Sequence, residues 1–166
     1  MKKLILSLGL LCFITQMYSQ ITKLPEVVIT AVNYKYINAV DTEDTDVSVK
    51  MLEEQVAMYD LKDSDLYNDE YDIYRISFFI PEGKIVAAYD KNGKIIRTIE
   101  KFNNVKLPIS VIKAISQRFP NWSLAKNVYS VIYHENNAKV KKQYKVKLEN
   151  GDKVMRLTLD ENGDSI

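Results

Sequence analysis

The chain has 166 residues, of which 46% are hydrophobic and 27% are charged, and its formal net charge is +1. That length suits one compact domain or two small fused units that bury enough surface to fold without disulfides. A single cysteine and a single histidine exclude a disulfide scaffold, thiolate metal centres and metal sites built from several histidines.

Residues 1–19 have the pattern of a secretory signal peptide. Lys2 and Lys3 precede an apolar run over residues 4–14, which is too short to span a bilayer, and a more polar stretch follows. We expect cleavage at the end of this segment. The mature protein would then be exported, either periplasmic or secreted, and would have no transmembrane segment.

The only cysteine, Cys12, lies inside this expected leader, so the mature chain would carry no thiol. Lipidation at Cys12 is an alternative to simple cleavage. It is disfavoured because the residue before a lipidated cysteine is normally small, and here that residue is Leu11.

Charge is distributed unevenly along the chain. Residues 41–72 carry twelve acids and two lysines, a local charge of −10, whereas residues 101–166 carry twelve bases and six acids, a local charge of +6. Such polarity lets two halves of one fold attract each other, and it can also steer charged partners. We interpret the acidic side chains as solvated.

The segment that follows the leader is predicted to be an extended arm and an acidic linker over residues 20–46. Within it, the β-branched and aromatic residues of 26–37 favour a strand or an extended arm. Val49, Leu52 and Val56 then recur at helical spacing, which predicts a first helix over about residues 48–61.

From residue 74 the apolar residues recur at every second position, which is typical of strands. We predict an antiparallel meander with strands over residues 74–80, 85–89 and 94–101, joined by turns at Pro81–Gly83 and Asn92–Gly93.

A second helix is predicted within residues 104–122, with Pro108 at its first position and Pro120 at its end. Its expected buried stripe consists of Val111, Ile112, Ile115 and Phe119. Three more strands are predicted over about residues 126–134, 139–148 and 153–160.

The two halves of the chain share a pattern. A shift of 70 residues places Tyr74 on Tyr144, and five of the 23 positions paired in this way are identical. The predicted fold class is therefore α+β, with two related units over 47–101 and 102–166, each a helix packed on an antiparallel meander.

Two short segments, "DKNGK" at residues 90–94 and "DENGD" at residues 160–164, begin like calcium loops. The spacing does not fit such a loop, because Lys94 stands at a ligand position in the first and Gly163 comes at position four in the second. We interpret both as Asn-Gly turns.

The second half, together with the first Asn-Gly turn, resembles the PepSY-like family of bacterial exported proteins, also described as β-lactamase-inhibitor-like. The shared pattern consists of Asn92-Gly93, Leu107-Pro108, Phe119-Pro120, Tyr144, Asn150-Gly151 and Asn162-Gly163. The resemblance implies an α+β fold with helices on one face of antiparallel sheets. It also implies protein binding or inhibition in the cell envelope, and it supplies no catalytic residues.

The chain offers little material for catalysis. It contains no G-x-S-x-G elbow, no P-loop and no G-x-G-x-x-G, so we expect neither an enzyme nor a cofactor. A small periplasmic hydrolase is the alternative, and it would have to use His134 or an acid pair such as Glu53–Glu54 or Asp69–Glu70.

One predicted strand carries a basic face that is a candidate partner-binding site. Lys141, Lys145 and Lys147 alternate with apolar residues, and the next strand adds Arg156 and Thr158 to the same face. Tyr129 and Tyr133 are expected to flank it. This face either binds an acidic protein, peptide or envelope polymer, or is a solvated surface whose lysines prevent aggregation.

We expect the partner to be another envelope protein or peptide rather than nucleic acid, because the chain is nearly neutral and lacks nucleic-acid-binding motifs. A structural, self-associating envelope protein is a third possibility. The partner's identity and the oligomeric state are left open by the sequence.

Overall fold

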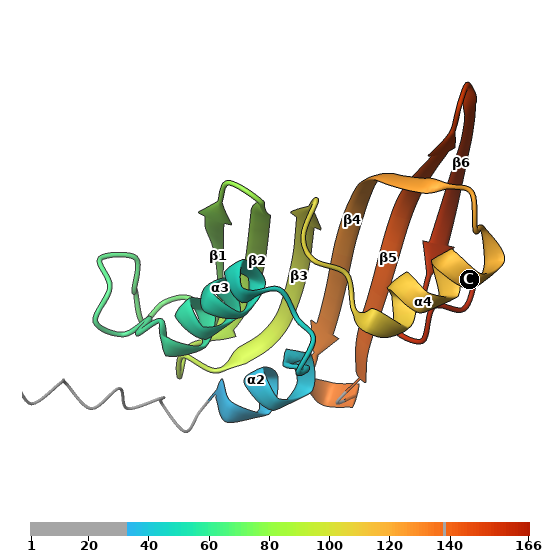
Figure 1. Ribbon diagram of the computed structural model, residues 1–166. Helices are drawn as coiled ribbons and strands as arrows, with labels where there is room; N and C mark the ends of the chain where they lie inside the picture. The colour runs from blue at the N-terminus through green and yellow to red at the C-terminus, as the bar shows by residue number, and fades with distance from the viewer. Residues whose placement is uncertain (1–32, 138) are drawn as a thin grey trace, which may run out of the picture.

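The computed structural model describes residues 33–137 and 139–166 (Figure 1). The expected signal peptide and most of the expected N-terminal arm lie outside the described residues. In chain order the elements are α2 (Tyr34–Val40), α3 (Val47–Met58), β1 (Ile73–Ile80), β2 (Gly83–Asp90), β3 (Ile95–Asn103), α4 (Ile109–Arg118), β4 (Ser123–His134), the 3-10 turn η2 (Glu135–Asn137), β5 (Lys139–Asn150) and β6 (Lys153–Leu159).

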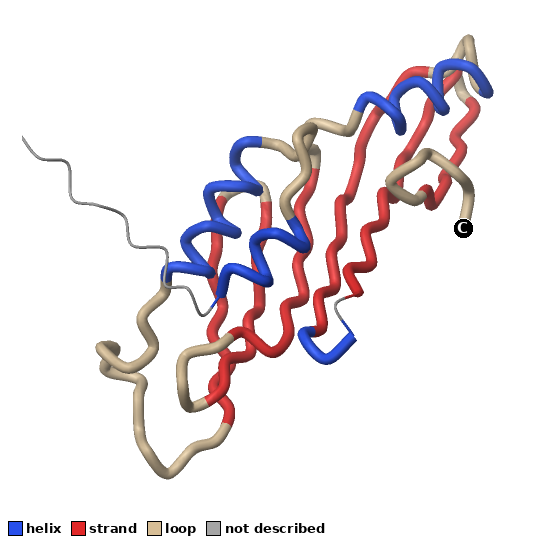
Figure 2. The backbone as a smooth tube through the Cα atoms, turned by 90° about the horizontal axis from the view of Figure 1, so that it is seen from below, coloured by secondary structure: helices blue, strands red, loops and turns tan. Residues whose placement is uncertain are grey.

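The strands form one antiparallel sheet in the order β1-β2-β3-β4-β5-β6, so each strand pairs with its neighbours in the sequence. Helices α2, α3 and α4 all lie against the same face of this sheet (Figures 1 and 2). Helix α3 contacts β1 and β2, α2 contacts β4 and β5, and α4 lies over the last strands. The α+β class is confirmed. The two predicted meanders are joined through the pairing of β3 with β4 into one continuous sheet.

The core fills the space between the helices and this face of the sheet. In α3 the residues predicted from helical spacing, Val49, Leu52 and Val56, are fully buried. Along β2 and β3 nearly every second side chain is buried. In β3 this alternation changes only near Ile95, at the irregularity in its pairing with β2. Burial of this apolar surface is the main source of stability in such a two-layer fold.

Two details of α4 differ from the prediction. Pro108 has an extended backbone and caps the helix instead of beginning it, since its ψ angle is 150°. Ile112 is 47% exposed, because it lies to one side of the helix face that buries Val111 and Ile115.

The predicted strand or arm over residues 26–37 is wrong from Tyr34 onward, where α2 begins. Tyr36 and Val40 are one helical turn apart and are both buried, so tertiary packing overrides the strand preference of this short segment. Asn33 anchors its start, because its amide donates to the carbonyl of Ala57 at 3.1 Å and accepts from the amide of Ile95 at 2.8 Å.

The two segments that begin like calcium loops are turns, as predicted. Asp90 Oδ1 accepts hydrogen bonds from the amides of Asn92 and Lys94 at 2.8 and 2.9 Å. Asp160 Oδ1 accepts from Asn162 and Asp164 at 3.0 and 2.8 Å. In both turns the glycine has a positive φ, 81° and 87°, a conformation that favours glycine.

Candidate functional site

The face of the sheet that points away from α2, α3 and α4 is the open face. The strand register places the predicted basic residues together on it. Lys145 of β5 pairs with Thr158 of β6, and Lys147 of β5 pairs with Arg156 of β6. On the other side of β5, Lys147 pairs with Lys126 of β4. Directly paired residues share a face, so these side chains are neighbours.

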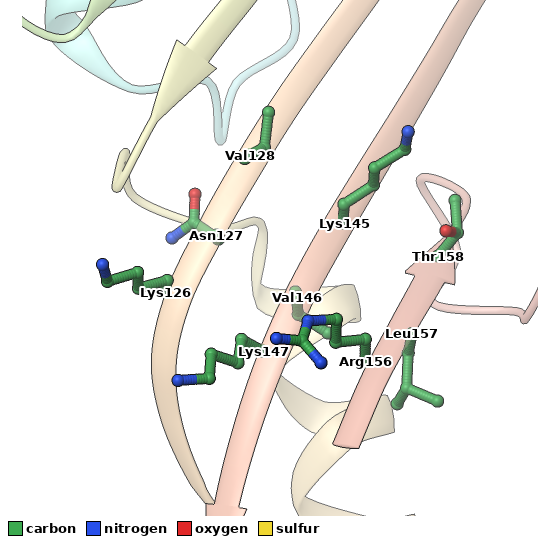
Figure 3. Close-up of a pocket in the computed structure, with 9 residues that line it drawn as sticks. All are labelled: Lys126, Asn127, Val128, Lys145, Val146, Lys147, Arg156, Leu157 and Thr158. Carbon is green, nitrogen blue, oxygen red and sulfur yellow. The ribbon is translucent and has the colours of Figure 1, made fainter. Parts of the chain in front are cut away.

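These residues line a surface pocket with a volume of about 570 Å³, shown in Figure 3. The Arg156 side chain extends over β5 towards Lys147 in this view. The basic pocket is defined by the side chains of Lys126, Val128, Lys145, Lys147, Arg156 and Thr158. Lys141 is also exposed on the open face but lies farther along β5, opposite Ile132.

Lys126 was not among the residues singled out from the sequence. It lies just after the register shift that separates Leu124 from Lys126 in the pairing of β4 with β5. Its alternation with Val128 and Ser130 puts it on the open face, whereas the sequence prediction had put Tyr129 and Tyr133, on the opposite side of this strand, beside the basic residues.

The charges of the basic pocket are mostly unopposed. Lys147 forms an ion pair with Glu149 at 2.6 Å. Within the part of the chain that the structure describes, Lys126, Lys145 and Arg156 form no ion pair. The pocket therefore presents a surplus of positive charge to solvent, and an anionic group there would gain favourable interactions.

The predicted role of Tyr129 and Tyr133 is wrong. Both side chains are on the helix-covered face, with exposed fractions of 3% and 2%. Tyr129 stacks on Tyr144 with ring centroids 4.7 Å apart, and Tyr133 meets the edge of Tyr36 at 5.3 Å. Alternation along β4 puts the two tyrosines on the side opposite Val128, so they cannot flank the basic pocket.

The helix-covered face contains a buried polar cluster that the sequence did not reveal. It consists of Glu53 from α3, Glu100 and Thr98 from β3, Lys142 from β5 and Tyr36 from α2. Both glutamates are 1% exposed and Lys142 is 8% exposed. Glu100 Oε1 accepts from Tyr36 Oη at 2.9 Å and from Thr98 Oγ1 at 2.6 Å.

Lys142 completes the cluster, because its ammonium group donates to the carbonyl of Val40 at 2.7 Å and so ties β5 to the end of α2. Burial raises the pKa of Glu53, and the neighbouring carboxyl of Glu100 raises it further. Burial likewise raises the pKa of Glu100, although the hydrogen bonds that Glu100 accepts from Thr98 and Tyr36 lower it. Glu53 Oε1 and Glu100 Oε2 are both buried without a hydrogen-bond partner in the described part of the chain, which favours a state in which at least one of the two carboxyls is protonated.

The interpretation of the acidic residues as solvated is therefore wrong for Glu53. Its carboxyl is enclosed, and the cavity that it borders has a volume of only about 20 Å³, which is too small for a substrate. The cluster holds helices to the sheet.

His134 lies at the end of β4 on the open face, where it pairs with Arg97 of β3. Within the described residues it forms no ion pair, and its side chain takes part in no hydrogen bond of the kind that orients a catalytic histidine. Residues 33–137 and 139–166 also contain no group of three His, Cys, Asp or Glu side chains placed to hold a metal ion.

None of the helices in the described part of the chain has the length and apolar character needed to cross a membrane.

No family model matches the sequence, and no curated protein matches it. Solved structures that are similar to this chain include the following three. A BLIP-like protein from Bacteroides fragilis NCTC 9343 is 19% identical, with a TM-score of 0.32 over 60% of this chain and 68% of that chain. A DUF2874 family protein from Bacteroides uniformis ATCC 8492 is 12% identical, with a TM-score of 0.35 over 60% of this chain and 71% of that chain.

A second DUF2874 family protein, from Bacteroides ovatus ATCC 8483, is 14% identical, with a TM-score of 0.34 over 60% of this chain and 68% of that chain. The resemblance to β-lactamase-inhibitor-like proteins is thus confirmed as a structural similarity. A proposal for the function of this chain rests on its own residues.

Proposed function

We propose that the protein is an exported, non-catalytic binding module of the bacterial cell envelope. It holds another envelope protein or peptide on the open face of its sheet, and the basic pocket is the main contact. Removal of residues 1–19 would leave it periplasmic or secreted.

The observation that carries this proposal is the concentration of bases on a rigid surface. Lys126, Lys145 and Arg156 project from three adjacent hydrogen-bonded strands, and no described helix covers them. A hydrogen-bonded sheet holds its side chains in place before a partner arrives, which lowers the entropy lost on binding. An acidic surface would replace the water around these bases with several charge-assisted hydrogen bonds.

The same features argue against the hydrolase alternative. Glu53 is enclosed by the core, and His134 stands opposite the cation Arg97 rather than a carboxylate. A catalytic base needs access to substrate and a group that orients it. We therefore infer that the chain is not an enzyme and that it needs no cofactor.

We also infer that the units 47–101 and 102–166 are related by duplication. The turns at residues 90–94 and 160–164 form the same set of hydrogen bonds. The bridge from Leu159 to Ser165 corresponds to the pairing of Tyr89 with Ile95 under the 70-residue shift. Under this 70-residue shift, β1 and β2 correspond to β5 and β6, so β4 is an additional strand of the second unit.

The proposed site can be tested with the triple variant Lys145→Glu, Lys147→Glu and Arg156→Glu. Crosslinking in the envelope fraction of the native cells should capture the partner with the unaltered protein. The triple variant should capture at least about tenfold less of it, with a weaker dependence on salt, because each rim charge contributes modestly and the three act together.

A matched control reverses three exposed bases on the helix side of the molecule, Lys35, Lys62 and Lys113, and so changes the net charge by the same amount. This control should capture the partner normally. Equal capture by the unaltered protein and both triple variants would contradict the site assignment.

A further inference from the structure

The open face carries a second feature, an apolar stripe that crosses the strands away from the basic pocket. Val86 of β2 pairs with Ile99 of β3, and Ile99 pairs with Ile132 of β4. These three residues define the apolar stripe. Ile99 is 44% exposed although β3 lies inside the sheet, between β2 and β4.

Basic residues flank the apolar stripe on both sides. Ala88 lies two residues beyond Val86 on β2, and it pairs with Arg75 of β1 on one side and with Arg97 of β3 on the other. These two arginines form the arginine row. Lys84 lies two residues before Val86 on β2, and it pairs with Lys101 of β3. These two lysines form the lysine row. Since a strand rises about 3.4 Å per residue, the two basic rows are roughly 14 Å apart with the stripe midway between them.

These flanking bases are available to a partner. Within the described residues Arg75, Arg97, Lys84 and Lys101 form no ion pair. The two arginines also line a surface pocket of about 270 Å³ whose floor includes Ile99. An apolar stripe between a row of arginines and a row of lysines favours a ligand that is apolar in the centre and anionic at its edges.

An α-helix has the dimensions that this pattern needs. Its diameter with side chains is about 10–12 Å, close to the separation of the two basic rows. An amphipathic helix carries an apolar seam bordered by polar residues on both sides, which matches a stripe bordered by bases on both sides. An extended peptide presents only one line of side chains to the surface, so it would satisfy one basic row at a time.

We propose that the open face binds an acidic amphipathic helix of its partner, which lies across strands β1 to β4. Its apolar seam packs on Val86, Ile99 and Ile132, and acidic residues on its two flanks meet the arginine row and the lysine row. This inference rests on the proposed function, because it names the part of an envelope protein that occupies the same face.

The test uses a synthetic peptide of about 14 residues, which spans roughly 21 Å as a helix and so crosses four strands about 4.8 Å apart. It has leucine along one seam and glutamate on both flanks. Fluorescence anisotropy measures its binding to the full mature chain. A peptide of the same composition in scrambled order should bind at least about tenfold more weakly, because it keeps the charge but loses the seam.

Two substitutions locate the peptide on the stripe. Ile99→Ser should weaken binding about tenfold, and Arg97→Glu should weaken it by a similar factor that shrinks at high salt. Ile112→Ser is the matched control, because Ile112 is 47% exposed on α4 and so is close to Ile99 in type and exposure. The control should bind the peptide normally.

Several outcomes would overturn the proposal. The scrambled peptide could bind as tightly as the designed peptide, or a proline-interrupted peptide that cannot form a helix could do so. The Ile99→Ser variant could also bind the designed peptide as tightly as the unaltered protein does. Concentration-dependent dimerisation that Ile99→Ser abolishes would assign the stripe to a second copy of the chain instead. Envelope capture that needs the basic pocket but tolerates Ile99→Ser overturns this inference alone. Capture that tolerates both changes overturns the proposed function as well.

Discussion

On strand β5 two neighbouring lysines meet opposite environments. Lys141 is exposed on the open face, whereas Lys142 is 8% exposed beneath the helices and donates a hydrogen bond to the carbonyl of Val40. The pleat of the strand alone separates them. The same residue type therefore supports the fold on one face and is free to meet a partner on the other.

The two faces of the sheet differ in the same way as a whole. The helix-covered face buries two carboxyls, of Glu53 and Glu100, and a lysine, so its charges are part of the folded structure. The open face keeps its bases in water, where each one has little effect on stability. Substitutions on the covered face should change the free energy of unfolding, and substitutions on the open face should change binding.

The largest expected effect is that of Lys142→Met. This change removes the cation of the buried cluster and leaves the carbonyl of Val40 without its donor. Removing one partner of a buried charged cluster is strongly destabilising, because the remaining charge is desolvated and unpaired. We expect the free energy of unfolding to fall by about 3 kcal/mol, as measured by urea denaturation.

Lys141→Met is the natural control, since it makes the same substitution one residue away on the exposed side of β5. It should alter the free energy of unfolding by no more than about 0.5 kcal/mol. Equal destabilisation by the two substitutions would show that the two faces do not differ as described.

A smaller effect is expected from Glu53→Gln, and it depends on pH. Burial and the carboxyl of Glu100 raise the pKa of Glu53 to about 9, while Lys142 opposes this increase and Asp41 adds to it. The unfolded chain loses the proton near pH 4.3, whereas the folded chain holds it to about pH 9.

Between these two pH values unfolding therefore releases a proton from Glu53. The stability that the protonated Glu53 contributes is complete below about pH 4.3, and it is lost as the pH rises towards 9. The free energy of unfolding of the unaltered protein should therefore fall as the pH rises across this range. Glu53→Gln cannot ionise, so its stability should depend less on pH and should exceed that of the unaltered protein at pH 8.5.

Glu54→Gln, which changes the exposed neighbour of Glu53, provides the comparison. Thermal melts at pH 5 and pH 8.5 should give this variant the same pH dependence as the unaltered protein. A flat profile in the unaltered protein would mean that the covered face holds no such proton.

The sequence predicted the features that depend on local pattern. Period-two alternation located all six strands, and helical spacing located α3 and α4, because each pattern reports which side of an element is buried. The turns at Asn92–Gly93 and Asn162–Gly163 were also predicted, since they depend on a few adjacent residues.

The features that depend on contacts distant in the sequence were missed. Glu53 and Glu100 are neighbours only because α3 packs on the sheet, and their burial has no signature in either segment. One signal was present, since Lys142 interrupts the apolar side of its strand. A base at such a position indicates a buried counter-charge, because an unpaired buried lysine is costly.

Dependence on distant contacts also explains why the position of Tyr129 was predicted wrongly. Its aromatic ring was expected beside the basic pocket but faces the helices. Alternation fixes which residues share a face with Tyr129, yet strand β4 has apolar side chains on both faces, so the pattern did not show which face is covered. The structure resolves this because Tyr129 stacks on Tyr144 in the core.

The smallest expected effect follows from that placement. Tyr129→Phe keeps the stacked ring and removes a buried hydroxyl that has no hydrogen-bond partner within the described residues. Stability should change by less than about 1 kcal/mol, and partner capture should be unaffected. Tyr36→Phe makes the same chemical change but removes the hydrogen bond to Glu100, so it should cost about 1.5 kcal/mol or more in urea denaturation. If Tyr129→Phe instead reduced partner capture at unchanged stability, the ligand would have to reach the covered face, and the assignment of binding to the open face would fail.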